Sequence, residues 1–530
     1  MKYFSSAFYF IKSTCLCVYL CYPVKEAEQL NYIMRVWKYS FIQNSWKENK
    51  AYVLTSLVLG TIYFIILRII YPVPSFYSDS FTWVGAAVTG QPVTFRPVGY
   101  SKIMRFLHLF TTSDFPLIAA QYFSNLFVNL FLFLTCNWFF KLYKPLKLLL
   151  FVLLIINPFY LFYSNYVSSD AFFCCLSVLW FTLLIWILYK PYWSLIIFQL
   201  VVLAGLFTLR YNAVFFPAIM ALAILLTKLT WPKKAIAIGI NVVTVAVIIM
   251  VTTYVTKKVT GTKTFSAFSG WQLANDALHV MQHEKIDTTT IKDKEVRSIV
   301  NFSDHFFDTT TEKFPDTTAT AYFMWYFKSP LKRYMTVYPG RSKSYFRTWN
   351  TLGPVYAKFG KTIILQKPLT YLQYFALPNL KAYFLPPLEI YETYMENRDT
   401  MPSVITKFFH YKTIKTPQHF PALYTAVFQP VRILFIAFNI MFICVTLYYV
   451  ISKRYLFQNR LFNQTLLSFS ALYLANFFFI VLLAPSVIRY HIFLLTLGFP
   501  IILYLLQQLL KPLQTEEKKM GNIGLQTTLQ

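Results

Sequence analysis

Long apolar stretches, separated by short polar segments, fill most of both ends of this 530-residue chain. Each stretch holds about 18 to 24 mostly apolar residues, enough for an α-helix to cross a hydrocarbon layer of roughly 30 Å. The pattern predicts an all-α, multi-pass membrane protein with about 10 to 11 transmembrane helices. The clearest spans are expected at 51–71, 117–140, 146–163, 170–189, 192–209, 211–227, 234–256, 430–451, 461–484 and 490–510.

Basic residues collect on one side of the predicted membrane. They occur in the segment with Lys38, Lys47 and Lys50 and in every second connection after it, which marks that side as cytoplasmic. The opposite connections are nearly free of basic residues, except for Arg210 and Arg489 at span ends. Two explanations stay open for these arginines: they snorkel to the interface, or they bind an anionic partner.

Two segments outside the membrane are expected on the opposite, outer side. The first outer loop is 72–116, and the second segment, 257–425, is too polar and proline-rich to span and long enough for a domain. Whether residues 1–33 form a helix, lie at the interface or precede the true start stays open. The predicted organisation is an N-terminal cytoplasmic or interfacial segment (1–50), a transmembrane core (51–256), an extracytoplasmic α-containing domain (257–425), C-terminal transmembrane helices (426–510) and a cytoplasmic tail (511–530).

Composition agrees with a membrane environment. Hydrophobic residues make up 57% of the chain and charged residues 13%, and the mean hydropathy is +0.48, which is outside the usual range of soluble domains. The net charge of +28 follows largely from the cytoplasmic lysines and arginines, and because no nucleic-acid-binding module is recognisable, we expect no nucleic-acid partner. The seven cysteines all lie in apolar stretches, so we expect packing rather than disulfides.

Acidic residues near the outer ends of spans are few. Asp79 follows the first span, Asp114 precedes the second and Asp170 opens the fourth. A carboxylate in a partly dry site can position and deprotonate a hydroxyl, or bind a divalent metal. Helix capping is the competing explanation for Asp170, which follows two serines, and an ordinary loop position is the competing explanation for Asp79.

Basic residues on the same side complement these acids. A lipid-linked phosphate or diphosphate needs positive donors as charge builds on its leaving oxygen. The combination of acids and bases therefore predicts a substrate that carries phosphate. The candidate donors are Arg96, Lys102, Arg210 and Arg489.

Four motifs, in this order and each at an outer span end, follow Asp79: "RPVGYSKIMRFL", "NPFYLFYSNYVSSDAFF", "AGLFTLRYNAVFFP" and "SVIRYHIFLLTLGFP". Together they resemble the GT-C superfamily of integral-membrane glycosyltransferases, especially bacterial members related to the protein mannosyltransferases and the aminoarabinose transferases. The resemblance covers 51–256 and 430–510. Each motif is degenerate, and the likeness depends on their order and shared side.

This resemblance implies a GT-C-like core and an inverting transfer of a sugar from a polyprenyl-phosphate donor to an extracytoplasmic lipid, glycan or protein. It implies catalytic roles for Asp79, as base or acceptor-positioning acid, and for Asp170, as a second acid near the donor or a metal. It implies that the donor phosphate is held by Lys102, Arg210 and Arg489, joined by Arg96.

The chain departs from the family pattern at two places. It reads "SDS" around Asp79 where many relatives carry two adjacent acids, and Val98 stands where "RPPGYP" is common. Whether a divalent metal is a cofactor, and which residue is the base, therefore stay open. The sugar and the acceptor are not specified either. The Lys/Ile/Phe/Tyr-rich composition and a lone outward-facing "NFS" sequon favour the bacterial inner (cytoplasmic) membrane, with the site facing outward.

Other classes of function fit the sequence less well. His279 and His283, spaced i, i+4, lack the glutamate that a zinc-protease helix requires, so we expect surface histidines rather than a metal site. A haem subunit would need paired histidines deep in spans, which are missing from the sequence. A multi-pass transporter or a flippase for lipid-linked glycans is the main alternative.

Overall fold

The computed structural model describes residues 24–90, 96–312, 314, 321–416, 420 and 422–510, and for residues 24–40 the backbone alone. Two terminal segments lie outside these ranges. They are residues 1–23, which include Cys15, Cys17 and Cys21, and the predicted cytoplasmic tail, 511–530. The chain divides into two compact units between Val58 and Leu59, a boundary that falls within helix α2 (Val24–Ile70). Apart from the first part of α2, the features below belong to the second unit.

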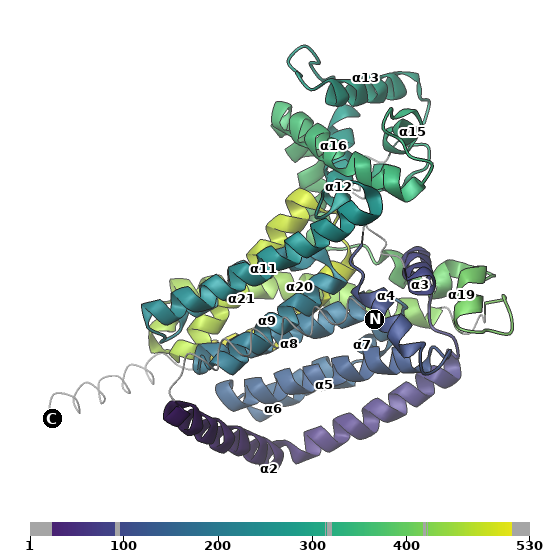
Figure 1. Ribbon diagram of the computed structural model, residues 1–530. Coiled ribbons are helices and arrows are strands. Elements are labelled where there is room, and N and C mark those ends of the chain that lie inside the picture. Colours follow the sequence, from purple (N-terminus) through teal and green to yellow (C-terminus); the bar gives the residue numbers. More distant parts are fainter. Residues whose placement is uncertain are drawn as a thin grey trace. The chain divides into compact units, whose positions relative to one another are not determined.

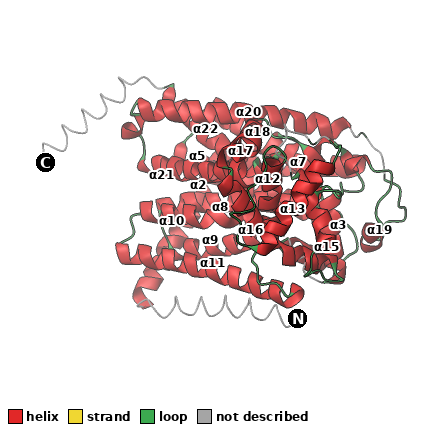
Figure 2. Cartoon of the chain, turned by 90° about the horizontal axis from the view of Figure 1, so that it is seen from above, coloured by secondary structure: helices red, strands yellow, loops and turns green. Residues whose placement is uncertain are grey.

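The described residues form helices and connections, and apart from isolated bridges no strand is found among them (Figure 2). Eight of the described helices are long and apolar enough to cross a membrane, which confirms an all-α, multi-pass membrane protein. These are Phe41–Ile70 of α2, α5 (Phe115–Phe140), Lys144–Ser164, α8 (Asp170–Tyr189), α11 (Trp231–Thr260), α20 (Ala422–Ile451), α21 (Arg460–Leu483) and α22 (Ile492–Leu509).

The predicted spans 192–209 and 211–227 correspond to two apolar helical runs that are shorter than 18 residues. Helix α9 covers Trp193–Leu209, and the next apolar helical run covers only Tyr211–Leu226, as a 3-10 turn, η2 (Tyr211–Phe215), followed by α10 (Phe216–Leu226). The chain leaves helical geometry at Arg210, whose backbone is extended, with φ −151° and ψ 139°. This break falls where the predicted spans 192–209 and 211–227 meet, at the charged residue between two apolar stretches.

Local sequence explains where many helices start and stop. Helix α11 has Pro232 in its first turn, where proline costs nothing because the missing N–H has no helical partner. It ends at Gly261, whose φ of +83° is the left-handed conformation that glycine adopts most readily. Helices α5 and α10 also carry proline in their first turn.

Burial distinguishes the central helices from the peripheral ones. In the most apolar window of α8, 83% of residues are buried, and in that of α22 the share is 89%, whereas for α11 it is 11%. Helices that are apolar all round and buried belong in the centre of a bundle, while α11 presents its apolar surface outward. Three described cysteines, Cys136, Cys174 and Cys175, are buried, but Cys444 is exposed.

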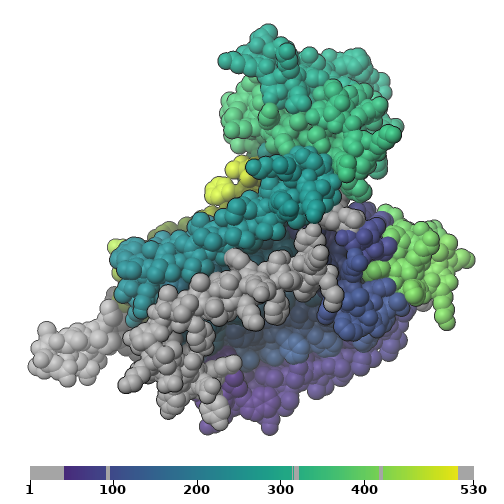
Figure 3. Space-filling model, viewed as in Figure 1, coloured from purple at the N-terminus to yellow at the C-terminus, as the bar shows by residue number. Residues whose placement is uncertain are grey.

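A separate hydrophobic cluster lies within the segment predicted as a soluble domain. Helices α12, α13, α15 and α16 group together in Figure 1, and the same region forms a compact body in the space-filling view (Figure 3). At its centre the rings of Trp271 and Trp349 stack at 4.9 Å, and Trp271 Nε1 donates a hydrogen bond to the Trp349 carbonyl. The cluster includes α12 (Ala267–Met281), α13 (Lys294–Thr309), α14 (Tyr322–Trp325), α15 (Pro330–Val337) and α16 (Tyr345–Gln366).

The rest of that segment returns to the membrane helices. The chain passes through α17 (Pro368–Tyr371) and η3 (Leu372–Ala376) into α18 (Leu377–Phe384). There Asn379 Nδ2 donates a hydrogen bond to the Ala484 carbonyl at 3.0 Å, and Tyr383 packs against His491. Among the described residues of 257–425, this separate hydrophobic cluster is formed by residues from Ala267 to Phe375.

Helices α12 and α16 touch backbone to backbone because glycine lies at their contact. A Cβ atom at Gly270 would stand 1.8 Å from the Gly353 carbonyl oxygen. Because this oxygen belongs to the backbone of α16, relieving the clash would require the two helices to move apart. We expect Gly270→Ala to destabilise the protein by about 1–3 kcal/mol. The matched control is Gly239→Ala in α11, where a Cβ meets nothing within 4 Å. Thermal unfolding of the detergent-solubilised protein measures both; equal melting temperatures for the two variants would contradict the close packing.

Candidate functional site

One carboxylate lies between two guanidinium groups at the end of the membrane bundle. Asp79 is the second residue of α3 (Ser78–Thr89), and its Oδ1 pairs with Arg96 Nη2 at 2.5 Å. Its Oδ2 pairs with Arg489 Nη1 at 3.1 Å, across 410 positions of the chain. The three side chains are between 14% and 18% exposed, so the pairs are largely shielded but still in contact with solvent.

Backbone contacts hold the start of α3 beside the start of α8. Ser75 forms a parallel bridge with Tyr166, in which the Ser75 N–H donates to the Asn165 carbonyl and the Val167 N–H donates to the Ser75 carbonyl. Ser80 Oγ then donates to the Val167 carbonyl at 2.7 Å. The loop that leads to Asp79 is thereby joined to the loop that leads to Asp170.

A second ion pair forms at the start of α8. Asp170 is the first residue of this helix, is 3% exposed on its side chain and pairs with Arg210. Its Oδ2 accepts hydrogen bonds from Ser168 Oγ at 2.7 Å and, more weakly, from the hydroxyls of Tyr391 at 3.3 Å and Tyr77 at 3.4 Å. The carboxylate thus binds side chains from other segments, so capping alone does not account for it.

Tyr490 connects the two ion-pair clusters. The guanidinium carbon of Arg210 lies 4.9 Å from the centre of the Tyr490 ring, and that of Arg489 lies 5.3 Å from it. Cations within about 6 Å of an aromatic face are attracted by the ring quadrupole. We call Asp79, Arg96, Asp170, Arg210 and Arg489 the charge cluster.

The surroundings of Asp79 set its protonation state. Burial raises the pKa of its carboxyl, but the charges and hydrogen bonds of Arg96 and Arg489 together outweigh burial and hold the pKa well below its usual range. Asp79 therefore stays ionised throughout the physiological range. A carboxylate so strongly stabilised accepts a proton poorly.

The remaining predicted residues lie apart from these pairs. Lys102, on α4 (Gly99–Leu107), is exposed and takes part in no ion pair within the described ranges. Asp114 forms its own pair with Arg68, with Nη2 and Oδ2 2.7 Å apart. The structure thus brings together five of the six residues predicted from the sequence, and the assigned roles stay predictions.

Several polar residues of the site could not be predicted from the sequence. Tyr77, Ser168, Tyr391 and Tyr490 stand among 39 tyrosines and many serines, so nothing local singles them out. Glu389, which lies close to Arg489, is one of several acids in an aromatic loop. Only the fold selects them.

The charge cluster does not offer a divalent metal site. Both oxygens of Asp79 face guanidinium groups, and Asp170 is occupied by Arg210 and hydroxyl donors. No group of three or more His, Cys, Asp or Glu residues suited to a metal occurs within the described part of the chain.

The expectation that His279 is a surface residue is wrong, because it is 4% exposed and packs on Phe323.

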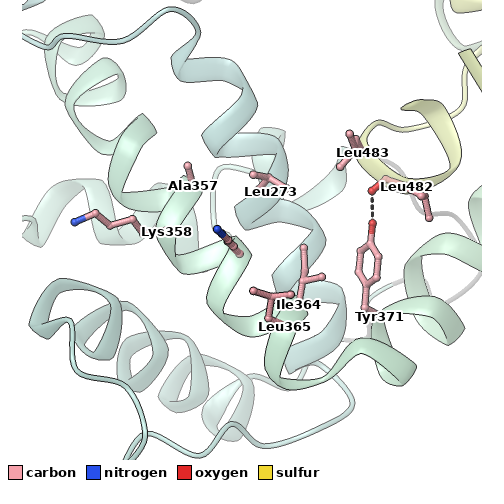
Figure 4. Close-up of a pocket in the computed structure, with 9 residues that line it drawn as sticks. Leu273, Ala357, Lys358, Ile364, Leu365, Tyr371, Leu482 and Leu483 are labelled. Carbon is pink, nitrogen blue, oxygen red and sulfur yellow. Dashed lines mark hydrogen bonds between the residues drawn. The ribbon is translucent and has the colours of Figure 1, made fainter. Parts of the chain in front are cut away.

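An apolar pocket of about 530 Å³ lies elsewhere, between α12, α16 and the end of α21. Figure 4 shows Leu273, Ile364 and Leu365 facing it from one side and Leu482 and Leu483 from the other. The hydroxyl of Tyr371 donates a hydrogen bond to the Leu482 carbonyl beside it. The pocket contains no residue of the charge cluster.

No family model matches the chain, and comparison with curated proteins and with solved structures returns no significant match. What the charge cluster does must therefore be inferred from its own chemistry.

The Asp79 pairs should contribute measurably to stability. In a double-mutant cycle of Asp79→Asn and Arg489→Gln, we expect a coupling energy of at least about 1 kcal/mol, because the two groups share a shielded ion pair. A folded pKa below the unfolded value of about 3.9 means that the stabilisation is present above that pH and is lost as the pH falls through the folded pKa. The destabilisation by Asp79→Asn should thus be constant between about pH 5 and 8.

Lys102→Gln is the control for this cycle, since it removes an exposed charge that has no ion-pair partner among the described residues. It should change the free energy of unfolding by less than about 0.5 kcal/mol. Additive effects of Asp79→Asn and Arg489→Gln would contradict the observed pairing.

Proposed function

We propose that this protein is a membrane glycosyltransferase that moves a sugar, with inversion, from a polyprenyl-phosphate-linked donor to an extracytoplasmic lipid, glycan or protein. The observation that carries the proposal is the convergence of Asp79, Asp170, Arg96, Arg210 and Arg489 at one end of a bundle of apolar helices. The motifs that contribute these residues resemble the GT-C superfamily in kind and order.

Phosphate recognition is supported by the excess of guanidinium groups. Three arginines meet two aspartates, which leaves one positive charge within the charge cluster. Guanidinium groups form charge-assisted, often bidentate hydrogen bonds with phosphate oxygens and stabilise the charge that develops on a leaving phosphate. Arg210 and Arg489, which flank Tyr490, are the central donors, and Arg96 and Lys102 complete the predicted set.

The position of the cluster suits a substrate with a lipid tail. Arg210 directly follows α9, Arg489 precedes α22 by a few residues, and Asp170 opens α8. At this boundary between apolar helices and polar connections, a prenyl tail stays in the membrane while its phosphate meets the arginines.

Charge at span ends also argues for transfer over transport. Transporters bind their substrates near the middle of the membrane, through broken helices and ionisable groups at that depth. The ionisable groups of the charge cluster lie at helix ends instead.

The two aspartates act in this proposal by positioning. Asp79, permanently ionised, orients Arg96 and Arg489 and accepts a hydrogen bond from the incoming hydroxyl. Asp170 fixes Arg210 and the hydroxyls of Tyr77 and Tyr391.

Transfer can be measured with purified, full-length protein in nanodiscs, using polyprenyl-phosphate sugars with a radioactive sugar and a panel of acceptors. We expect transfer by the wild type and a loss of about 100-fold or more in Arg210→Gln and in Asp79→Asn. The first removes a donor to the developing phosphate charge, and the second removes the carboxylate that orients Arg96 and Arg489. Normal expression and monodisperse elution of both variants exclude misfolding.

The matched control is Lys285→Gln, which removes one positive charge from an exposed ion pair remote from the charge cluster. Its activity should equal that of the wild type. If the labelled lipid instead crosses the bilayer of proteoliposomes and no new glycosidic bond forms, the protein is a flippase and the proposal fails. A fully active, normally expressed Asp79→Asn variant would also count against it.

A further inference from the structure

A third carboxylate, Glu389, lies beside the charge cluster and belongs to none of its ion pairs. It opens a short 3-10 turn, η4 (Glu389–Glu392), after α18. The turn is tied to the segment of Arg489, because the Ile488 N–H donates a hydrogen bond to the Pro387 carbonyl at 3.2 Å. The turn also contacts Asp170, because the hydroxyl of Tyr391 in the same turn donates a hydrogen bond to the Asp170 carboxylate.

More contacts fix this turn in place. The Tyr166 hydroxyl lies within hydrogen-bonding distance of the Ile390 and Thr393 carbonyls, at 3.1 and 3.2 Å. The Tyr391 ring stacks on Phe428 of α20, with centroids 4.8 Å apart. Glu389 therefore stands on a turn that hydrogen bonds join to the segment of Arg489 and to Asp170, and a group that acts on a bound substrate requires such support.

Glu389 differs from both aspartates because its carboxylate is available to bind a substrate hydroxyl. Asp79 is clamped by two arginines, and Asp170 is bound by Arg210 and three hydroxyls. Glu389 is exposed, and within the described ranges its carboxylate forms no ion pair and accepts no hydrogen bond. Its carboxylate can approach a new hydroxyl without breaking a contact recorded among the described residues, and it lies close enough to Arg489 and Asp79 to interact with both charges.

The electrostatic surroundings of Glu389 favour proton uptake. Desolvation by the surrounding protein raises the pKa of its carboxyl above the usual value, although the residue is exposed, and the negative charges of Asp79 and Glu392 raise it further. Arg489 opposes this shift without cancelling it. The adjoining parts of α20 contribute Phe428 and Thr425, which do not titrate. A carboxyl whose pKa moves towards neutrality is a better general base.

The backbone conformation of Glu389 also indicates a functional role. Its φ is +50°, in the left-handed region that side chains other than those of glycine, asparagine and aspartate seldom adopt. Glycine would satisfy this conformation without strain. Strained residues of this kind concentrate at functional sites, where the side chain is needed in spite of its cost.

We propose that Glu389 is the general base of the transfer reaction. This inference rests on the proposed function. The carboxylate takes the proton from the acceptor hydroxyl while the acceptor oxygen forms a bond to the anomeric carbon of the sugar. The bond from that carbon to the phosphate oxygen breaks on the opposite face, and its electron pair leaves with the polyprenyl phosphate, whose new charge the arginines stabilise. Glu389 then returns its proton to solvent.

The test compares steady-state kinetics of full-length wild type, Glu389→Gln and Glu389→Asp in nanodiscs, with a radiolabelled polyprenyl-phosphate sugar as probe. Glu389→Gln should lower kcat by about 100- to 10,000-fold, with KM for the donor changed less than about threefold. Glu389→Asp should retain part of the activity. In the wild type, kcat should fall as the pH drops through the raised pKa of Glu389, because the base must be ionised, and this acid limb should be missing from the residual activity of Glu389→Gln.

Two variants separate chemistry from folding. Glu389→Gly relieves the backbone strain, so its melting temperature should equal or exceed that of the wild type while transfer is lost. Glu392→Gln removes the neighbouring acid of the same turn and should keep kcat within about threefold of the wild type. Full activity in Glu389→Gln or Glu389→Gly, or an equal loss in Glu392→Gln, overturns the assignment of the base and leaves the glycosyltransferase standing. Absence of transfer by the wild type with every donor overturns both.

Discussion

The position of one carboxylate between two guanidinium groups organises this end of the protein. Asp79 joins the start of α3, the segment that precedes α4 and the turn before α22 through Arg96 and Arg489. Ion pairs that are mostly shielded from water are strongly held, because an unpaired charge there would be costly. These segments therefore cannot move apart independently, and the remaining polar groups are arranged around the pairs.

Three carboxylates of similar intrinsic acidity acquire different properties from their surroundings. Arginines keep the pKa of Asp79 low, and the ion pair and hydrogen bonds of Asp170 fix its orientation. Among the described residues Glu389 has neither an ion pair nor a hydrogen bond to its carboxylate, and its pKa is raised. Different surroundings can separate the pKa values of neighbouring carboxyl groups. One group can then position other side chains while another transfers a proton. The proposed assignment of roles follows this division.

The charged residues are carried by short turns and helix ends that long helices hold in place. The bridge between Ser75 and Tyr166 aligns two of these connections, and the ring of Tyr490 separates two arginines at fixed distances. Buried helices such as α8 and α22 provide the rigid base. Irregular backbone supported in this way can present several side chains to one substrate, while the apolar helices below it accommodate a lipid tail.

The sequence alone determined the class of protein, because apolar length and helical periodicity are local properties that directly reflect the thickness of a membrane. It also singled out Asp79, Asp170, Arg210 and Arg489, since charges at span ends are conspicuous in so apolar a chain. The tertiary structure decided which of these charges meet. It also decided that His279 is buried and that Glu389, which forms no ion pair among the described residues, lies near Arg489. Contacts across hundreds of residues depend on how the helices pack, and no local pattern along the chain encodes them.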